Sequence, residues 1–546
     1  QQSTSPVNAY LFARPVALAK ILPALSYDQA LFQKGFLMNA ARRLQALSIT
    51  STEASTIKNY LKGYRRRLAA EYTKPIAERK GIAELEENAN LAEKELARTV
   101  AGYADALRQV KWEEVKSGLK QQEAAIEFVY FEVGFPQKTD SMMYAALLIL
   151  PGAEQPMFIP LFEEKELQKK MSKKITPQHQ ELVAQMYTRG LVPLGGNNNQ
   201  EGLYDLLWKP LDSLLAGIKK IYYSPAGMLH QINFNAIPVG YDANDEVLIL
   251  ADKYELVRLG STRSIVVPDV TQINAANEMS LYGGIHYEID TTLHTFTDSI
   301  LHKNNNYPSN FTYALRSVPN RGGAWNYLPG TEHEIAEIFS IGERAHYPIS
   351  IYQGSNAKEE TVKELGKGKP SPRILHIATH GFFFPNPVIN KEAHGLGATE
   401  SIFKLSDNPM IRSGLMLAGS NYTWKKGRPW RDGMEDGILT AYEISQMNLS
   451  NTELVVLSAC ETGLGDIQGN EGVYGLQRAF KIAGAKYLMM SLWQVPDEET
   501  KEFMIGFYKN WLEKKLSIPD AFRITQKEMH EKYTNPYLWA GFVLVE

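Results

Sequence analysis

Short apolar runs separated by amphipathic stretches dominate most of the chain. Between residues 18 and 119, apolar residues recur at helical spacing among Lys, Arg, Glu and Gln, which predicts several amphipathic helices. From residue 124 the pattern changes to short strand-like runs with helical stretches between them, such as 177–189 and 202–218. The runs in this part are 125–130, 144–150, 221–223 and 247–250. Such alternation is typical of an α/β domain, and we expect a largely parallel sheet there.

A second alternating unit begins near residue 280. Its predicted strands are 281–287, 346–352, 374–379, 454–459, 487–493 and 542–545, and its predicted helices are 331–340, 357–365, 471–483 and 498–513. Two connections, 290–323 and 382–440, are too long for simple turns, and we expect them to surround a site. We therefore predict a helical region over 1–121, which would suit the end of a helical-repeat array, and two α/β domains over 122–275 and 276–546.

Charge and hydropathy exclude some classes of function. The 546 residues include 58 Lys and Arg and 61 Asp and Glu, a net charge of −3, which indicates no nucleic-acid partner. No apolar run reaches the roughly 20 residues that span a bilayer, so we expect no membrane partner. We predict a soluble, cytoplasmic protein, although a start at Gln1 rather than Met makes the N-terminus a weak guide to localisation.

Cys460 is the only cysteine in the chain. One cysteine cannot form an intrachain disulfide or supply a zinc site with several thiolates. Free cysteine is among the most often buried residue types, so an inert thiol is one interpretation. The position of Cys460 favours a reactive thiol, because it follows the apolar strand 454–459 at the end where open α/β sheets place ligands and catalytic groups.

His380 ends a second apolar strand in the same way. If the two strands are parallel neighbours, His380 and Cys460 face each other across one crevice, where an imidazole activates a thiol. His376 and His380 would form a metal pair on a helix, but on a strand they lie roughly 13 Å apart. We therefore interpret His376 as a core histidine and His380 as the base, and we expect no metal and no cofactor.

The glycines between residues 463 and 472 leave a third interpretation, which is nucleotide binding. Their spacing is GxGxxxG rather than GxGxxG, and the chain ends too soon for the second half of a dinucleotide-binding fold. Glycines beside a nucleophile also suit a loop that reorders around an incoming peptide. Nucleotide binding predicts thermal stabilisation by NAD or ATP and is the least favoured interpretation.

Several motifs in order resemble the CHAT proteases, relatives of caspases and separase in the caspase-like clan of cysteine peptidases. The matching stretches are 112–115, 124–128, 224–230, 328–331, 376–381, 457–463, 469–484, 491–495 and 539–543. The resemblance implies a caspase-type α/β/α sandwich with a mostly parallel sheet over 276–546. It also implies that the domain over 122–275 is protease-like but inactive.

The resemblance further implies roles for individual residues. Cys460 would be the nucleophile and His380 the general base of a dyad, with the backbone N–H groups of Gly381 and Cys460 forming the oxyanion hole. Relatives that cut after Arg or Lys often have an Asp two positions before the cysteine, and caspases have a Gln. Ser458 stands there in this chain, so neither specificity is supported. The candidates for lining the substrate pocket are Ser458, Glu461 and Asp466.

We therefore predict a cysteine endopeptidase that performs regulated limited proteolysis of a protein substrate through an acyl-enzyme. CHAT domains are commonly coupled to helical repeats and to bacterial defence or cell-death modules. The resemblance thus suggests an activating protein or upstream helical repeats, and a bacterial gasdermin-like or other effector as target. The alternative is a catalytically silent pseudoprotease that acts as a scaffold for protein partners.

Overall fold

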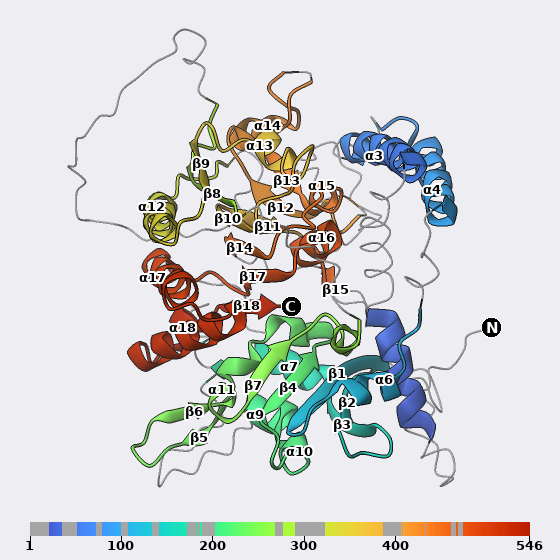
Figure 1. Ribbon diagram of the computed structural model, residues 1–546, viewed down its shortest axis with the longest axis vertical. Coiled ribbons are helices and arrows are strands. Elements are labelled where there is room, and N and C mark those ends of the chain that lie inside the picture. The colour runs from blue at the N-terminus through green and yellow to red at the C-terminus, as the bar shows by residue number, and fades with distance from the viewer. Residues whose placement is uncertain are drawn as a thin grey trace.

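Two β-sheets with helices packed around them form most of the structure, which is a computed structural model (Figure 1). It describes residues 21–34, 52–72, 79–99, 108–133, 141–171, 183, 186–187, 202–267, 277–289, 323–385, 406, 408–431, 433–459, 466–467 and 473–546. Within these residues, no helix combines the length and apolar character needed to cross a membrane.

The described part of the N-terminal region is helical, as predicted. Helices α3 (Thr52–Tyr72) and α4 (Ile82–Thr99) pack on each other through a small apolar core of their own. They contact the second sheet's domain, where the Arg65 guanidinium donates to the Gln446 amide oxygen at 3.2 Å. A further helix, over 21–34, lies with α6 (Trp112–Gly118) beside the first sheet, in blue in Figure 1.

The first sheet has the strand order β3-β2-β1-β4-β7. Its strands are β1 (Glu123–Glu132), β2 (Met142–Ile149), β3 (Met157–Glu163), β4 (Lys220–Ser224) and β7 (Glu255–Arg258). The prediction of a largely parallel sheet is wrong here, because β1, β2 and β3 pair antiparallel and only β4 and β7 continue parallel to β1. The connections between the first three strands are too short for a parallel crossover.

Two details of this domain also differ from the prediction. The run predicted as a strand at 247–250 forms β6 (Val247–Ile249) in a separate hairpin with β5 (Pro238–Tyr241). The helical stretch at 202–218 is divided into α9 (Leu203–Leu207) and α10 (Lys209–Asp212), since Pro210 cannot continue the hydrogen bonding of a helix interior. Most of the expected helix at 177–189 lies outside the described residues.

Alternate residues of β1 face opposite sides of the first sheet. Ala125 and Val129 pack with the helix over 21–34 and with α6, whereas Ile126 and Phe128 belong to the large core on the other side. That core continues without a break into the second domain. The helix over 21–34 and α6 therefore cover this face of the sheet together.

The second sheet has the order β18-β17-β14-β10-β8-β9. Its strands are β8 (Met279–Ile285), β9 (Ile349–Gly354), β10 (Ile374–Ala378), β14 (Leu454–Ser458), β17 (Tyr487–Ser491) and β18 (Phe542–Val545). All six predicted strands occur in it, five of them parallel and β18 antiparallel. Strands β10, β14 and β17 are buried along their whole length, as expected for parallel strands covered on both faces.

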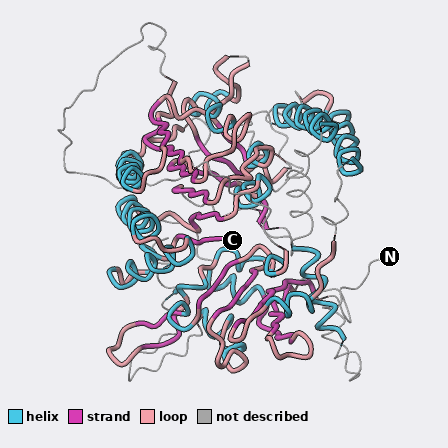
Figure 2. The backbone as a smooth tube through the Cα atoms, in the orientation of Figure 1, coloured by secondary structure: helices cyan, strands magenta, loops and turns pink. Residues whose placement is uncertain are grey.

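Helices cover both faces of the second sheet (Figure 2). One layer contains α12 (Pro329–Arg344), α17 (Asp497–Tyr508) and α18 (Ile518–Lys532), and the other contains α15 (Ala441–Ile444) and α16 (Leu476–Ala483). The predicted α/β/α sandwich with a mostly parallel sheet is confirmed. Helix α18 was not predicted.

The long connection after β10 contains regular structure of its own. β11 (Gly381–Phe383), β12 (Ser413–Met416) and β13 (Ile438–Thr440) form a small antiparallel sheet, and α14 (Ser420–Lys426) lies between β12 and β13 in the chain. The first of these strands starts directly after His380. The long connection therefore contributes a small sheet of its own next to the expected site.

The two large sheets meet at their edges. The N–H of Glu546, just after β18, donates to the Arg258 carbonyl at the end of β7 at 3.1 Å. The Asn233 side chain donates to the carbonyls of Ala540 and Phe542 at 2.8 and 3.2 Å. The domain boundaries at 121/122 and 275/276 stay predictions, and the second lies outside the described residues.

Candidate active site

Strands β10 and β14 are parallel neighbours, which is the condition on which the predicted dyad depends. Ala378 at the end of β10 is aligned with Ser458 at the end of β14. His380 follows the first of these residues by two positions, and Cys460 follows the second by two positions. Cys460 itself lies outside the described residues, so its contacts with His380 stay a prediction.

His380 is held in a defined orientation. Its side chain is buried between the rings of Tyr287 and Trp325, whose centroids both lie 5.0 Å from the imidazole. Nε2 lies 2.7 Å from the carbonyl oxygen of Asn326. Because a carbonyl only accepts, Nε2 carries the proton in this contact, and Nδ1 is the basic nitrogen of the neutral ring.

The main chain on either side of His380 is also fixed. The Thr379 N–H donates to the Ser458 carbonyl at 3.3 Å, and the Met416 N–H donates to the His380 carbonyl at 2.9 Å. Gly381 then opens β11 opposite Leu415. These bonds connect the end of the large sheet to the small one, and the oxyanion role of the Gly381 N–H stays a prediction.

The candidates for the substrate pocket are placed differently from one another. Ser458 is completely buried, and its hydroxyl donates to Oε2 of Glu334 at 3.0 Å. The backbone of Asp466 lies in the short strand β15 (Asp466–Ile467), which pairs with β16 (Val473–Tyr474). Glu461 and most of the glycine-rich loop lie outside the described residues. All three pocket roles stay predictions, and the hydroxyl of Ser458 is engaged with Glu334 in the interior.

His376 is a core histidine, as predicted. It is fully buried on β10, its Nδ1 lies 3.2 Å from the hydroxyl of Tyr508, and its Nε2 lies 2.9 Å from Oε1 of Glu334. Glu334 was not predicted as a site residue, although one signal was present: the residue lies on the apolar stripe of α12 with Ile338 and Ile341. The Asn326 carbonyl was not predicted either, and no side-chain signal for it exists.

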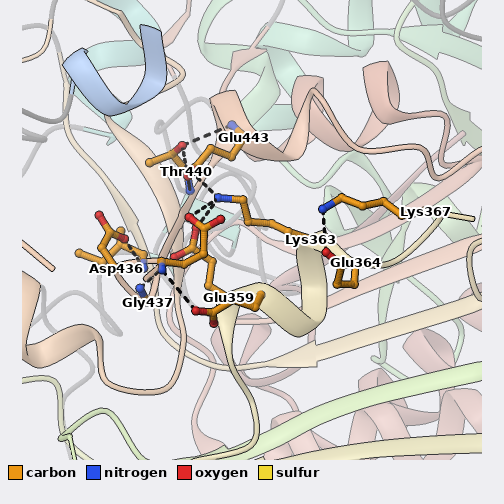
Figure 3. A network of polar contacts seen from close by, with 11 residues as sticks. Glu359, Lys363, Glu364, Lys367, Asp436, Gly437, Thr440 and Glu443 are labelled. Atoms are coloured by element: carbon orange, nitrogen blue, oxygen red, sulfur yellow. Dashed lines mark hydrogen bonds and ion pairs between the residues drawn. The ribbon is translucent and has the colours of Figure 1, made fainter. Parts of the chain in front are cut away.

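Away from His380, a cluster of charged side chains connects α13 (Glu359–Lys363) with the segment around β13 (Figure 3). The Lys363 ammonium forms ion pairs of 2.8 to 3.0 Å with the carboxylates of Glu359, Glu435 and Glu443. Three acidic side chains so close together are one arrangement that binds a metal ion. Here the ammonium already supplies a positive charge to all three carboxylates.

Burial and crowded charge shift the protonation of this cluster. Burial, followed by the charges of Glu443 and Asp436, raises the pKa of Glu359 well above its usual value. Burial, followed by the charge of Glu443, raises the pKa of Asp436 to about 7. Burial alone would lower the pKa of Lys363, but the charges of Glu443 and Glu359 outweigh burial and raise it. The cluster therefore retains protons near neutral pH.

A family model described as the CHAT domain matches residues 199–546, more than half of the chain. The chain belongs to the CHAT domain family. The resemblance noted in the sequence is thereby confirmed for the family. The match covers all of the second sheet, and also β4 and β7 of the first.

Two curated proteins and two solved structures are similar to this CHAT-domain chain. Tetratricopeptide repeat protein 28 of Mus musculus is 34% identical over 111 residues, which cover 20% of the chain and 4% of that protein. The Homo sapiens protein of the same name is 31% identical over 236 residues, covering 40% and 8%. The chain thus spans less than a tenth of the length of these relatives.

The two structures are similar at low sequence identity. The Saccharomyces cerevisiae separase–securin complex aligns at 9% identity and a TM-score of 0.41, over 98% of this chain and 36% of that one. The Arg-specific cysteine proteinase gingipain R aligns at 11% identity and a TM-score of 0.34, over 69% and 68%.

Proposed function

We propose that the chain is a cysteine endopeptidase that cleaves a protein substrate through a dyad of Cys460 and His380. The observation that carries this proposal is the alignment of Ala378 with Ser458 on parallel neighbouring strands. Because these two strand ends are adjacent, the segments that lead to His380 and Cys460 both leave the sheet at the same edge. The carbonyl of Asn326 orients the imidazole there.

The chemistry follows from the orientation of His380. Nδ1 takes the proton of the Cys460 thiol, and the sulfur attacks the carbonyl carbon of the scissile bond. The N–H groups of Gly381 and Cys460 stabilise the resulting oxyanion. His380 then gives its proton to the leaving amine, and an acyl-enzyme remains. Water attacks this thioester with His380 again as base, which releases the acid product and restores the thiol.

We further propose that the activity is regulated through the helical region. Arg65 of α3 contacts Gln446, and Tyr72 of α3 packs edge-on against Tyr442 of α15 at 6.2 Å. The similarity to tetratricopeptide repeat proteins supports a role for upstream helical repeats or an activating protein. Limited proteolysis of an effector in bacterial defence or cell death is the setting that the CHAT resemblance suggests.

The test compares the purified chain with its Cys460→Ala variant, each incubated with candidate activators and candidate substrates. We expect substrate fragments only with the wild-type cysteine. Alkylation by iodoacetamide gives a readout that needs no substrate, because Cys460 is the only thiol in the chain. An activated thiolate reacts much faster near neutral pH than an inert buried thiol. Identical cleavage by the two proteins would falsify the proposal.

The same contacts of α3 also favour the second candidate, a silent scaffold in which the helical region binds partners. A scaffold predicts slow alkylation of Cys460 and no cleavage with any activator. Labelling and cleavage together therefore separate the two candidates.

A further inference from the structure

One buried carboxylate links the two strands that lead to the predicted dyad. Glu334 on α12 is only 1% exposed. Its Oε2 accepts from the hydroxyl of Ser458, the last residue of β14, at 3.0 Å. Its Oε1 lies 2.9 Å from Nε2 of His376 on β10. Glu334 therefore contacts β14 two residues before Cys460 and β10 four residues before His380.

The far side of His376 is fixed as well. The hydroxyl of Tyr508 on α17 lies 3.2 Å from Nδ1. Burial, and then the charge of Glu334, raises the pKa of Tyr508 well above its usual value, so this hydroxyl keeps its proton and can donate it to Nδ1. The proton of the neutral His376 ring is then on Nε2 and faces Glu334, although this N–H is not well aligned for a hydrogen bond. Tyr508 therefore presents its proton to His376, and His376 presents its own proton to Glu334.

Glu334 differs from the other buried glutamates in its partners. Glu127 has the ammonium of Lys34 at 2.9 Å, and Glu359 has that of Lys363 at 3.0 Å. In the described part of the chain, no lysine or arginine contacts Glu334. A buried carboxylate without a full positive partner destabilises a fold. Such local conflicts are expected at functional sites.

The segment that carries Glu334 also reaches His380. Just before α12, the Asn326 carbonyl contacts Nε2 of His380 and the Trp325 ring packs on the imidazole. The helix lies so close to β8 that a Cβ on Gly283 would be 2.7 Å from the Thr331 carbonyl oxygen. Anchoring α12 through Glu334 therefore also anchors the two residues that orient the imidazole.

We propose that Glu334 is a positioning residue for the peptidase reaction. By accepting the hydrogen bond from Ser458 on β14 and lying against His376 on β10, it fixes the start of α12 relative to both strands, and it thereby sets the distance and angle between the His380 imidazole and the Cys460 thiol. This inference rests on the proposed function. A misplacement of about 1 Å between reacting groups lowers a rate by about 10²-fold, which is the size of effect expected on removing the anchor.

The experiment uses the 546-residue chain and its Glu334→Gln variant. We expect kcat to fall about 10²-fold while KM changes by less than about threefold, because the substrate does not touch Glu334. The pH profile of iodoacetamide alkylation at Cys460 should shift to higher pH, because the thiol loses its aligned imidazole. Glu359→Gln is the matched control: it alters an equally buried glutamate in the same domain, and it should leave kcat and the alkylation profile per folded molecule unchanged.

Ser458→Ala gives a second test should the first variant fail to fold. It removes one hydrogen bond without changing any charge, and we expect a fall in kcat of about tenfold. Wild-type kcat and alkylation in the Glu334 and Ser458 variants would overturn the positioning role, and so would equal losses in the Glu334 and Glu359 variants. If wild-type Cys460 reacts no faster than in His380→Ala, the proposed function fails and this inference fails with it.

Discussion

Each of the two α/β domains buries a histidine close to the end of its parallel strands, but only one of these rings is oriented. His230, in the turn η2 (Gly227–Gln231) after β4, has no hydrogen-bond partner for either ring nitrogen among the described residues. Burial, and then the charges of Arg258 and Lys34, lowers its pKa well below the usual value. His380 has the Asn326 carbonyl on Nε2. A strand-end position alone therefore does not make a histidine a base, and an orienting acceptor is also needed.

Each domain also buries a glutamate, and the two glutamates differ in whether a lysine neutralises their charge. Glu127 on β1 pairs with Lys34 and accepts from the Thr262 N–H and hydroxyl, so its charge is neutralised within a closed cluster. Glu334 has only Ser458 and His376 as partners among the described residues. The first cluster fastens a helix to a sheet. The second lies directly beneath the residues that the proposed chemistry uses.

The largest effect should follow from removing the imidazole of His380. His380→Ala deletes the proposed base, and we expect peptide hydrolysis per folded molecule to fall about 10⁴-fold. Turnover of a cleaved substrate and the alkylation rate of Cys460 measure this effect. His230→Met is the matched control and should retain wild-type turnover. Equal losses in the two variants would abolish the distinction between the histidines.

The next largest effect concerns the closed cluster of the first domain. Lys34→Ala leaves Glu127 buried without its cation, which should lower the free energy of unfolding by about 3 to 5 kcal/mol. Urea unfolding followed by circular dichroism measures it. Lys111→Ala removes an exposed ion pair to Asp28 beside the same helix and should change stability by less than about 1 kcal/mol. Turnover per folded molecule should not change in either variant.

The smallest effect concerns the proton that the folded protein holds in the cluster around Lys363. The pKa of Asp436 is raised in the folded state, from its usual 3.8 to about 7. The folded protein therefore holds a proton that the unfolded chain releases above pH 3.8, and stability should fall as pH rises from 4 to 7. The side chain of Asp436→Asn stays neutral at every pH. The free energy of unfolding of this variant should therefore exceed that of the wild type by about 1 to 3 kcal/mol at pH 8.

Unfolding in urea at a series of pH values measures this difference. Asp520→Asn is a control of opposite sign, because a hydrogen bond from Ser517 lowers the pKa of Asp520. That variant should not gain stability over the wild type as pH rises. Parallel pH curves for the wild type and Asp436→Asn would contradict a proton held by this cluster.

The sequence was most informative where strands are buried on both faces. Strands β10, β14 and β17 are almost entirely apolar runs, and the ends of the first two predicted His380 and Cys460 as site residues. In the first sheet the edge strand β3 (Met157–Glu163) contains an exposed Pro160 and buries only Phe158 and Phe162, so periodicity did not distinguish it from a loop. The Asn326 carbonyl was not predictable, because any residue offers the same backbone oxygen. Glu334 was predictable, although it was not predicted, because it is a charged residue on the apolar stripe of α12.

The edge-to-edge junction of the two sheets has a consequence for biosynthesis. β7 meets residue Glu546, and Asn233 reaches Ala540 and Phe542, so the edge of the first sheet is covered by segments made much later in the chain. During translation the first domain emerges with β7 uncovered, and an uncovered strand edge invites pairing with other nascent chains. Slow synthesis of the second domain, or its truncation, should therefore increase dependence on chaperones that shield such edges.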